Sequence, residues 1–184
     1  HSCHPLLPCV LAKLCNLIMF SGYVATGFGR SYTVPLQKGT KTCGQSLNAD
    51  DFRGISISPV LSKVFEHCVL DRYGNFLITS DNQFWFKKSV GCSHAIYSAR
   101  SIIDNYVAGG STVNICALDI SKAFDQMPHI GLYLNLMRRN VPLNVLCVIE
   151  HWFKNCYTCV KWVSALSGFF KLRCGFVKAG YCCP

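Results

Sequence analysis

Helical and strand-like apolar patterns alternate along the chain, and this alternation is the feature that most limits its fold. Apolar residues recur at three- or four-residue spacing in the ranges 8–20, 58–69, 93–107, 129–139 and 143–154. Shorter stretches with strand character lie at 31–36, 112–118, 158–163 and 169–174. The chain shows no internal repeat and no low-complexity linker, so the pattern predicts an α+β fold without a clean domain boundary.

Local signals predict where several of these elements begin and end. Ser58 is the predicted N-cap of the second helix, and Pro59 is its predicted first residue. Gly109 and Gly110 end the third helix, and the range 37–51, rich in Lys and Gly, predicts a mobile basic loop. The second helix is expected to bury one face, made of Val60, Leu61, Val64, Phe65, Cys68 and Val69.

The charge and the cysteines restrict the class of protein. A formal charge of +9 favours a polyanionic partner, either nucleic acid or an anionic membrane surface. Lys13 interrupts the first apolar stretch, which predicts an amphipathic helix and no membrane span. The 13 cysteines are scattered and odd in number, so reduced thiols and an intracellular location are expected. Because the chain opens with His1, we expect a fragment whose natural start lies upstream.

The segment ALDISKAFD at 117–125 is the most informative for chemistry. The predicted strand 112–118 is expected to be at least half buried and to deliver Asp119 at its C-terminal end. A carboxylate there can hold a divalent metal against a triphosphate, because Mg²⁺ prefers one or two protein carboxylates together with phosphate oxygens. Spacing alone leaves an alternative open, in which Asp119 caps the following helix.

Segment 117–125 resembles motif A of the reverse transcriptases of non-LTR (LINE-type) retrotransposons, and three further blocks follow the same family in order. SYTVPLQK at 31–38 resembles its first fingers strand, and DFRGISISPVLSKVFE at 51–66 is similar to its "YRPISLLPVLSKVFE" block. DNQFWFKK at 81–88, followed by SHAI at 93–96, is similar to "QFGFKKGHST..AI". In this sequence Trp85 replaces the family's small glycine and Gly54 replaces the proline after Arg53.

The resemblance implies a truncated right-hand polymerase fold, with helices packed on an incomplete antiparallel sheet. It implies an N-terminal helical segment at 1–30, a fingers-like region at 31–111 and a partial palm at 112–184. Asp119 would be the catalytic residue and metal ligand, the Ile120 carbonyl would lie beside the nucleotide, and Phe124 would sense the sugar. Asp125 would support the metal ligand without binding the metal, although a first-turn carboxylate facing the helix dipole explains it equally well.

The resemblance also implies which cations bind the substrates. Lys38 and Arg53 would hold the incoming triphosphate, since a guanidinium can donate two parallel hydrogen bonds to phosphate oxygens. Lys87 and Lys88, beside aromatic residues, would hold a single-stranded template. Solvated lysines remain an alternative for Lys38 and for the 87–88 pair.

Two features predict that these 184 residues do not polymerise alone. No Asp or Glu follows Glu150, so a second acidic pair, the family's "ADD", is absent. In addition, GFVKAGYCCP at 175–184 stands where the family has "GVRQGSVLSP". With assumed codons, a shift of one base restores Val-Arg-Gln-Gly, which suggests a frameshift that degraded motif B. The nucleotide sequence decides this hypothesis.

The prediction is therefore a fragment of an RNA-directed DNA polymerase, whose partners would be an RNA template, a DNA primer and a deoxynucleoside triphosphate. Mg²⁺ would bind weakly, no obligate protein partner is evident, and a nuclear location follows if the protein is like the family. The alternatives are a non-catalytic basic nucleic-acid-binding module and an unstable product of a decayed gene. A zinc site at Cys156 and Cys159 with His151 is a weak candidate, because a second Cys pair is missing.

Overall fold

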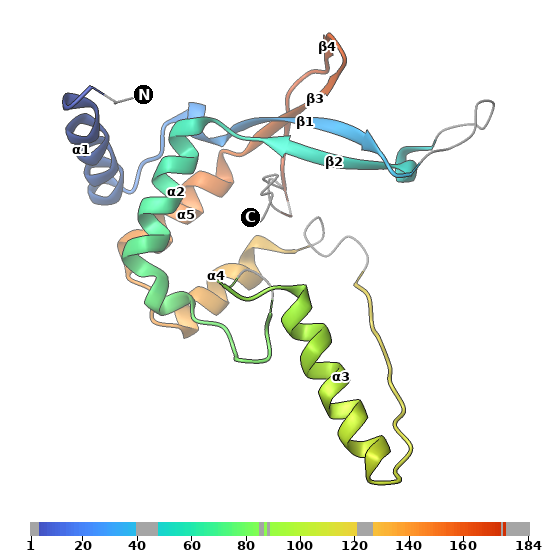
Figure 1. The fold of residues 1–184 in the computed structure, drawn as a ribbon. Helices are drawn as coiled ribbons and strands as arrows, with labels where there is room; N and C mark the ends of the chain where they lie inside the picture. The colour runs from blue at the N-terminus through green and yellow to red at the C-terminus, as the bar shows by residue number, and fades with distance from the viewer. Residues whose placement is uncertain are drawn as a thin grey trace. The chain divides into compact units, whose positions relative to one another are not determined.

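The structure, a computed structural model, describes residues 4–39, 48–84, 87, 89–120, 127–173 and 175. It divides the chain into two compact units (Figure 1). We call the first, His1–Phe76 with Lys122–Pro184, the sheet unit, and the second, Leu77–Ser121, the helix unit. The chain combines helices with a sheet, which is consistent with the predicted α+β class.

The helices form where the apolar spacing predicts them, within one or two residues, except that α2 extends four residues past the predicted range 58–69. In the sheet unit they are α1 Leu6–Ser21, α2 Val60–Tyr73, α4 His129–Arg138 and α5 Leu143–Lys154. Short 3₁₀ turns occur at η1 Thr26–Gly29, η2 Ala49–Asp51 and η3 Gly74–Leu77, the last of which leads into the helix unit. Gly22 ends α1 with a left-handed φ of 67°, and its N–H donates to the Ile18 carbonyl. The glycine signal at the end of α1 is therefore confirmed.

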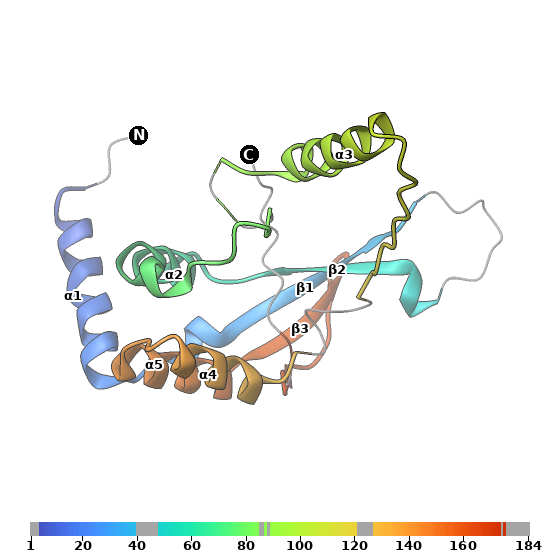
Figure 2. The same cartoon turned by 90° about the horizontal axis from the view of Figure 1, so that it is seen from below.

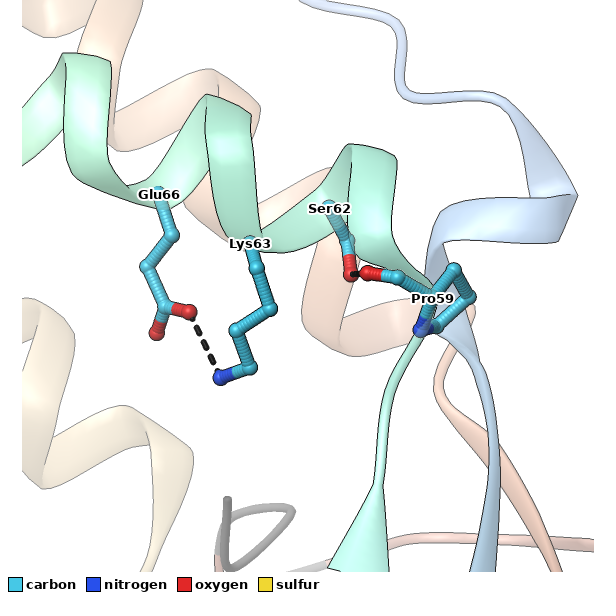
Figure 3. Close-up of polar contacts among 4 residues, drawn as sticks. All are labelled: Pro59, Ser62, Lys63 and Glu66. Atoms are coloured by element: carbon cyan, nitrogen blue, oxygen red, sulfur yellow. Dashed lines mark hydrogen bonds and ion pairs between the residues drawn. The ribbon is translucent and has the colours of Figure 1, made fainter. Parts of the chain in front are cut away.

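The start of α2 differs from the prediction. The helix begins at Val60 with Pro59 in the N-cap position, and the Ser58 hydroxyl is buried without a hydrogen-bond partner in the described part of the chain. Instead, the Ser62 hydroxyl donates to the Pro59 carbonyl at 2.7 Å, as Figure 3 shows. The predicted N-cap is therefore wrong, because the Ser58 hydroxyl accepts no hydrogen bond from the first N–H groups of the helix among the residues that the structure describes. The buried residues of α2 are Ser62 and Phe65, whereas Val60, Leu61 and Cys68 are exposed.

Five strands form one sheet in the order β2-β1-β3-β4, with β5 also paired to β3. Their bounds are β1 Arg30–Gln37, β2 Phe52–Ile57, β3 Tyr157–Trp162, β4 Ala165–Leu166 and β5 Phe170–Lys171. The β1–β2 pair is antiparallel and the β1–β3 pair is parallel, and β1 lies between them (Figure 2). The sheet is thus mixed: β1–β2, β3–β4 and β3–β5 are antiparallel, and the parallel β1–β3 pair departs from the expected antiparallel sheet. Parallel pairing is possible because a long connection with several helices separates β1 from β3.

The main core of the sheet unit joins α1, η1, α2 and α5. Its buried side chains are Ile18, Val24, Phe28, Phe65 and Val148. Phe28, Phe65 and Trp152 meet with ring centroids 5.7–6.1 Å apart, which is a favourable range for aromatic pairs. Gly29 lies at the edge of this core, where a Cβ would overlap the Asn155 carbonyl oxygen. The close approach of η1 to the end of α5 therefore requires glycine at this position.

The helix unit contains α3 Cys92–Ala108, as predicted, but the predicted strand at 112–118 is absent. Residues 111–120 form neither helix nor strand, and Ile115 and Leu118 are 72% and 91% exposed. A strand needs hydrogen-bonding partners on a neighbouring strand. Residues 111–120 pair with no described strand, so the expectation of a buried strand at 112–118 is wrong.

Candidate functional site

The two cations predicted to bind triphosphate lie on one hairpin. Arg53 of β2 stands opposite Leu36 of β1, and Lys38 follows Leu36 by two residues. The Lys38 N–H donates to the Asp51 carbonyl at 2.8 Å, and its ammonium donates to the Asp50 carbonyl at 2.9 Å. Since opposed residues of an antiparallel pair share a face, Arg53 and Leu36 point to the same side of the hairpin. Lys38 lies just past the end of β1, where its two bonds to the Asp51 and Asp50 carbonyls hold it against the start of β2.

Gly54, which follows Arg53, has a packing reason to lack a side chain. A Cβ at Gly54 would lie 2.9 Å from Cγ2 of Thr33 on the neighbouring strand. The Thr33 hydroxyl itself hydrogen-bonds with those of Ser56 at 2.7 Å and Thr158 at 3.2 Å, so three strands are connected through it. These bonds hold Thr33 in place. Gly54, which replaces the family's proline, therefore packs against a cluster of hydroxyl groups on the sheet face opposite Arg53.

Asp119 belongs to the helix unit and is exposed, as are its neighbours Leu118 and Ile120. Within the described residues, no group of three or more His, Cys, Asp or Glu side chains could hold a metal ion. Phe124 and Asp125, which are the other predicted residues of this motif, lie outside the described residues. The described residues alone therefore do not fit a complete magnesium site, and Asp119 stands as a single carboxylate.

Of the predicted template pair, Lys87 is described and Lys88 is not. The Lys87 ammonium donates to the Ser80 carbonyl at 2.6 Å and lies 4.0 Å from the carboxylate of Asp81. Its side chain is 25% exposed. The adjoining aromatic residues Trp85 and Phe86 also lie outside the described residues. Lys87 thus closes a local turn, and its role toward a template stays a prediction.

One arrangement was not foreseen from the sequence: the four cations within the strands, Arg30, Arg53, Lys161 and Lys171, all occupy one face of the sheet. Arg53 is opposite Leu36, Lys171 is opposite Tyr157, and Tyr157 is opposite Arg30. Lys161 follows Tyr157 by four residues and Arg30 precedes Leu36 by six, so the alternation puts all four cations on the same side. We call this side, with Tyr32, the basic sheet face.

Aromatic rings accompany these cations. The Lys161 ammonium lies 5.4 Å from the centroid of the Tyr32 ring, and the Arg30 guanidinium lies 5.7 Å from that of Phe169. These distances are within the range of cation–π attraction. Arg30, Arg53, Lys161 and Lys171 are exposed, and Phe169 is 57% exposed. Cations and rings thus stand together on a solvent-facing surface, which no single sequence segment reveals.

The cysteine pair considered for zinc is explained by packing. Cys156 and Cys159 are both buried, and burial raises the pKa of the Cys156 thiol to about 11. A metal ligand needs the thiolate, which this environment disfavours. His151 accepts a hydrogen bond from the Val24 N–H at 3.2 Å and packs on Tyr23 with ring centroids 4.8 Å apart. All the described cysteines are free thiols.

Gly175, the first residue of the predicted motif B segment, is hydrogen-bonded to the chain that begins α4. The Gly175 N–H donates to the Met127 carbonyl at 2.9 Å, and Nε2 of His129 bonds to the Gly175 carbonyl at 2.9 Å. Gly175 has a φ of 76°, which suits glycine. The rest of the segment predicted to correspond to motif B, residues 176–184, lies outside the described residues. Met127 follows the motif A segment by two residues.

None of the helices in the described ranges is both long enough and apolar enough to cross a membrane.

No protein-family model matches the chain. Over 123 residues it is 27% identical to the protein described as probable RNA-directed DNA polymerase from transposon X-element of Drosophila melanogaster. The match covers 63% of this chain and 13% of that protein, so the chain spans a small part of the relative's length. This similarity supports a relationship between the chain and the reverse transcriptases of transposons.

Proposed function

We propose that the chain is the fingers and the first part of the palm of a non-LTR retrotransposon reverse transcriptase, and that these 184 residues alone do not polymerise. The observation that carries the proposal is the β1–β2 hairpin, in which Arg53 is exposed on β2 and Lys38 lies just past the end of β1. The sequence similarity to the X-element polymerase supports the same interpretation. An RNA template, a DNA primer and a deoxynucleoside triphosphate are the proposed partners.

Arg53 is the proposed anchor for the triphosphate. It is exposed and emerges from a paired strand, so its backbone is held by the sheet while its guanidinium remains available for phosphate oxygens. Lys38 supplies a second positive charge, although its ammonium must exchange the Asp50 carbonyl for a phosphate. Asp119 is the proposed metal ligand, with the Ile120 carbonyl beside it, and Phe124 is the residue proposed to sense the sugar.

The number of carboxylates limits the chemistry. Mg²⁺ at a polymerase site would neutralise charge on the triphosphate and on the attacking and leaving oxygens. That arrangement needs several acidic ligands, and no Asp or Glu follows Glu150 in these 184 residues. We therefore expect weak Mg²⁺ binding and no catalysis by this stretch alone. A primer-extension assay with the 184-residue chain should show no incorporation, and template-dependent extension would contradict the proposal.

Nucleotide binding gives the positive test. We expect the chain to bind a fluorescent deoxynucleoside triphosphate, and Arg53→Ala to weaken that binding about 10-fold or more, since hydrogen bonds to charged groups contribute roughly 1.5–3 kcal/mol. Arg100→Ala is the matched control, because Arg100 is an exposed helix residue ion-paired with Asp104 at 3.7 Å. Equal losses in the two variants would remove the assigned role of Arg53.

Asp119→Asn separates the metal from the nucleotide. Binding without Mg²⁺ should be unchanged, whereas any enhancement of triphosphate binding by Mg²⁺ should disappear, because the amide cannot replace the carboxylate charge. A titration with and without Mg²⁺ measures both quantities. If Mg²⁺ enhances binding equally in the variant and the parent, Asp119 is not the metal ligand.

A non-catalytic nucleic-acid-binding module is the second candidate function, and the basic sheet face favours it. A module of this kind would bind oligonucleotides with steep salt dependence and show no preference for a free triphosphate. The polymerase fragment should bind both ligands, with Arg53 contributing to the triphosphate. Comparing the two ligands on the same protein distinguishes these functions.

A further inference from the structure

We propose that the basic sheet face binds a single-stranded polynucleotide that runs along the strands. The phosphates would contact Arg30, Lys161 and Lys171, and exposed bases would stack on Phe169. This inference deepens the proposed function and rests on it for the kind of partner, but its residues are distinct from the predicted template pair in the helix unit. It is carried by the register of the sheet, by the charge on its two faces and by the exposed rings.

The pairing register places every strand cation on one side. Tyr157 is opposite both Arg30 and Lys171, and Lys161 lies on the same side of β3 as Tyr157. The contact between the Lys161 ammonium and the Tyr32 ring confirms that these two side chains share a face. The opposite face carries no cation from a strand and holds the hydroxyl cluster of Thr33, Ser56 and Thr158.

The charges of these residues are not neutralised by the sheet. None of the five strands contains Asp or Glu. On the helices, by contrast, Lys63 pairs with Glu66 at 2.8 Å (Figure 3), and Lys154 pairs with Glu150 at 2.7 Å. Within the described residues, none of the four strand cations is ion-paired with a carboxylate. Exposed cations without acidic neighbours fit a polyanion, because neutralising phosphates releases bound counterions.

The exposed rings favour a single strand over a duplex. Phe169 is 57% exposed and Tyr157 is 37% exposed. The faces of bases are available for stacking in a single strand, whereas in a duplex they are stacked on each other. Along β1, the distance from Arg30 to Leu36 is roughly 20 Å at about 3.3 Å per residue. Leu36 is paired with Arg53, so the four cations span about this length. Several phosphates of one strand can lie along such a row.

Fluorescence polarisation with labelled 12-mers of uridine and of deoxythymidine tests the surface. Lys161→Ala/Lys171→Ala should weaken binding about 10-fold at moderate salt and lower the slope of log K against log salt by about 1.4, or about 0.7 per phosphate contact. The control is Lys13→Ala/Lys154→Ala, which removes the same net charge from α1 and α5 and should change binding less than about 3-fold. An equal loss of affinity in the two double variants would overturn the proposal.

Two adjacent phenylalanines test the stacking. Phe169→Leu should weaken binding of both 12-mers about 5-fold or more, since stacking on an aromatic ring contributes roughly 1–3 kcal/mol per base. Phe170 is paired with Thr158, on the other face, and is similarly exposed at 48%. Phe170→Leu should therefore leave binding nearly unchanged. A larger loss in Phe170→Leu than in Phe169→Leu would overturn the assigned face.

The remaining outcomes separate this inference from the proposed function. A 12-base-pair duplex that binds as tightly as the single strands would overturn it, whereas weaker binding supports it. The uridine and deoxythymidine arms show whether the 2′-hydroxyl contributes, and tight binding of either supports the surface. Should neither oligonucleotide bind while the triphosphate binds through Arg53, this inference fails and the proposed function stands. Circular dichroism of each variant verifies that the sheet is intact.

Discussion

The sheet unit and the helix unit contain similar apolar patterns but bury them differently. In the sheet unit, Phe65 and Val148 are 2% and 1% exposed at the centre of a core built from several elements. In the helix unit, no described residue is buried, and Ile96 of α3 is 67% exposed. Apolar spacing therefore predicts that a helix forms, whereas the burial of its apolar face depends on the other segments that pack against it.

The same contrast separates β1 from residues 111–120. Both stretches contain alternating β-branched or aliphatic residues, and both were predicted to form strands. β1 is bonded on one side to β2 and on the other to β3. Residues 111–120 are bonded to no strand in the described ranges and form none. Whether a stretch forms a strand therefore depends more on the strands available to pair with it than on its own sequence.

The largest expected effect comes from removing a core ring. Phe65→Ala should lower the free energy of unfolding by about 3–5 kcal/mol, because it deletes a buried aromatic side chain and leaves a cavity. Ile96→Ala is the counterpart in the helix unit, and its effect should stay within about 0.5 kcal/mol because the side chain is already exposed. Urea unfolding followed by circular dichroism measures both. Similar losses of unfolding free energy in the two variants would contradict the difference in burial between the units.

The next effect depends on pH. Burial raises the pKa of Cys156 to about 11, from an ordinary value of 9.0. As the pH rises past about 9, the thiol ionises first in the unfolded chain, so folding stability is complete below pH 9 and is lost toward pH 11, by on the order of 2–3 kcal/mol. Urea midpoints at pH 8 and pH 10.5 measure this loss.

Cys156→Ala controls for other groups that titrate in this range. The variant should lose less stability between pH 8 and pH 10.5 than the parent chain does. An identical decline in both would show that Cys156 is not the source. Thiol alkylation rates compare the two units directly. Cys92 and Cys116 of the helix unit are exposed and should react much faster than the buried Cys156.

The smallest effect concerns two glycines of the same turn. Gly29→Ala should cost about 1–3 kcal/mol, since the new Cβ overlaps the Asn155 carbonyl and the backbone must shift. Gly27→Ala, where a Cβ meets nothing within 4 Å, should be close to neutral. Thermal melts of the two variants provide the measurement. If Gly27→Ala destabilises as much as Gly29→Ala, the tight approach of η1 to α5 is not the cause.

Local sequence signals predicted the helices well and the sheet only in part. Helix spacing and glycine stops gave α1, α3, α4 and α5, because these signals act within a few residues. The strand β2 was not predicted, since Gly54 lowers the strand character of a six-residue stretch. The parallel pairing of β1 with β3 joins residues 127 positions apart, and no local pattern predicts such a contact.

The candidate site shows the same limit. Lys38, Arg53 and Asp119 were predicted because each lies in a segment that resembles a known family motif. The basic sheet face was not predicted, because its four cations come from four strands and only the register shows that they share a side. The positive charge was visible in the composition, but its distribution required the pairing.

The central position of β1 also affects how the protein is made on the ribosome. At about 5–20 residues per second, the ribosome takes roughly 6–25 s to advance the 126 positions from Ser31 to Tyr157. During this interval one edge of β1 has left the exit tunnel while its eventual neighbour has not yet been translated. A nascent chain with an open edge is prone to pair with other chains, so chaperone capture during translation should matter more for this strand than for any helix.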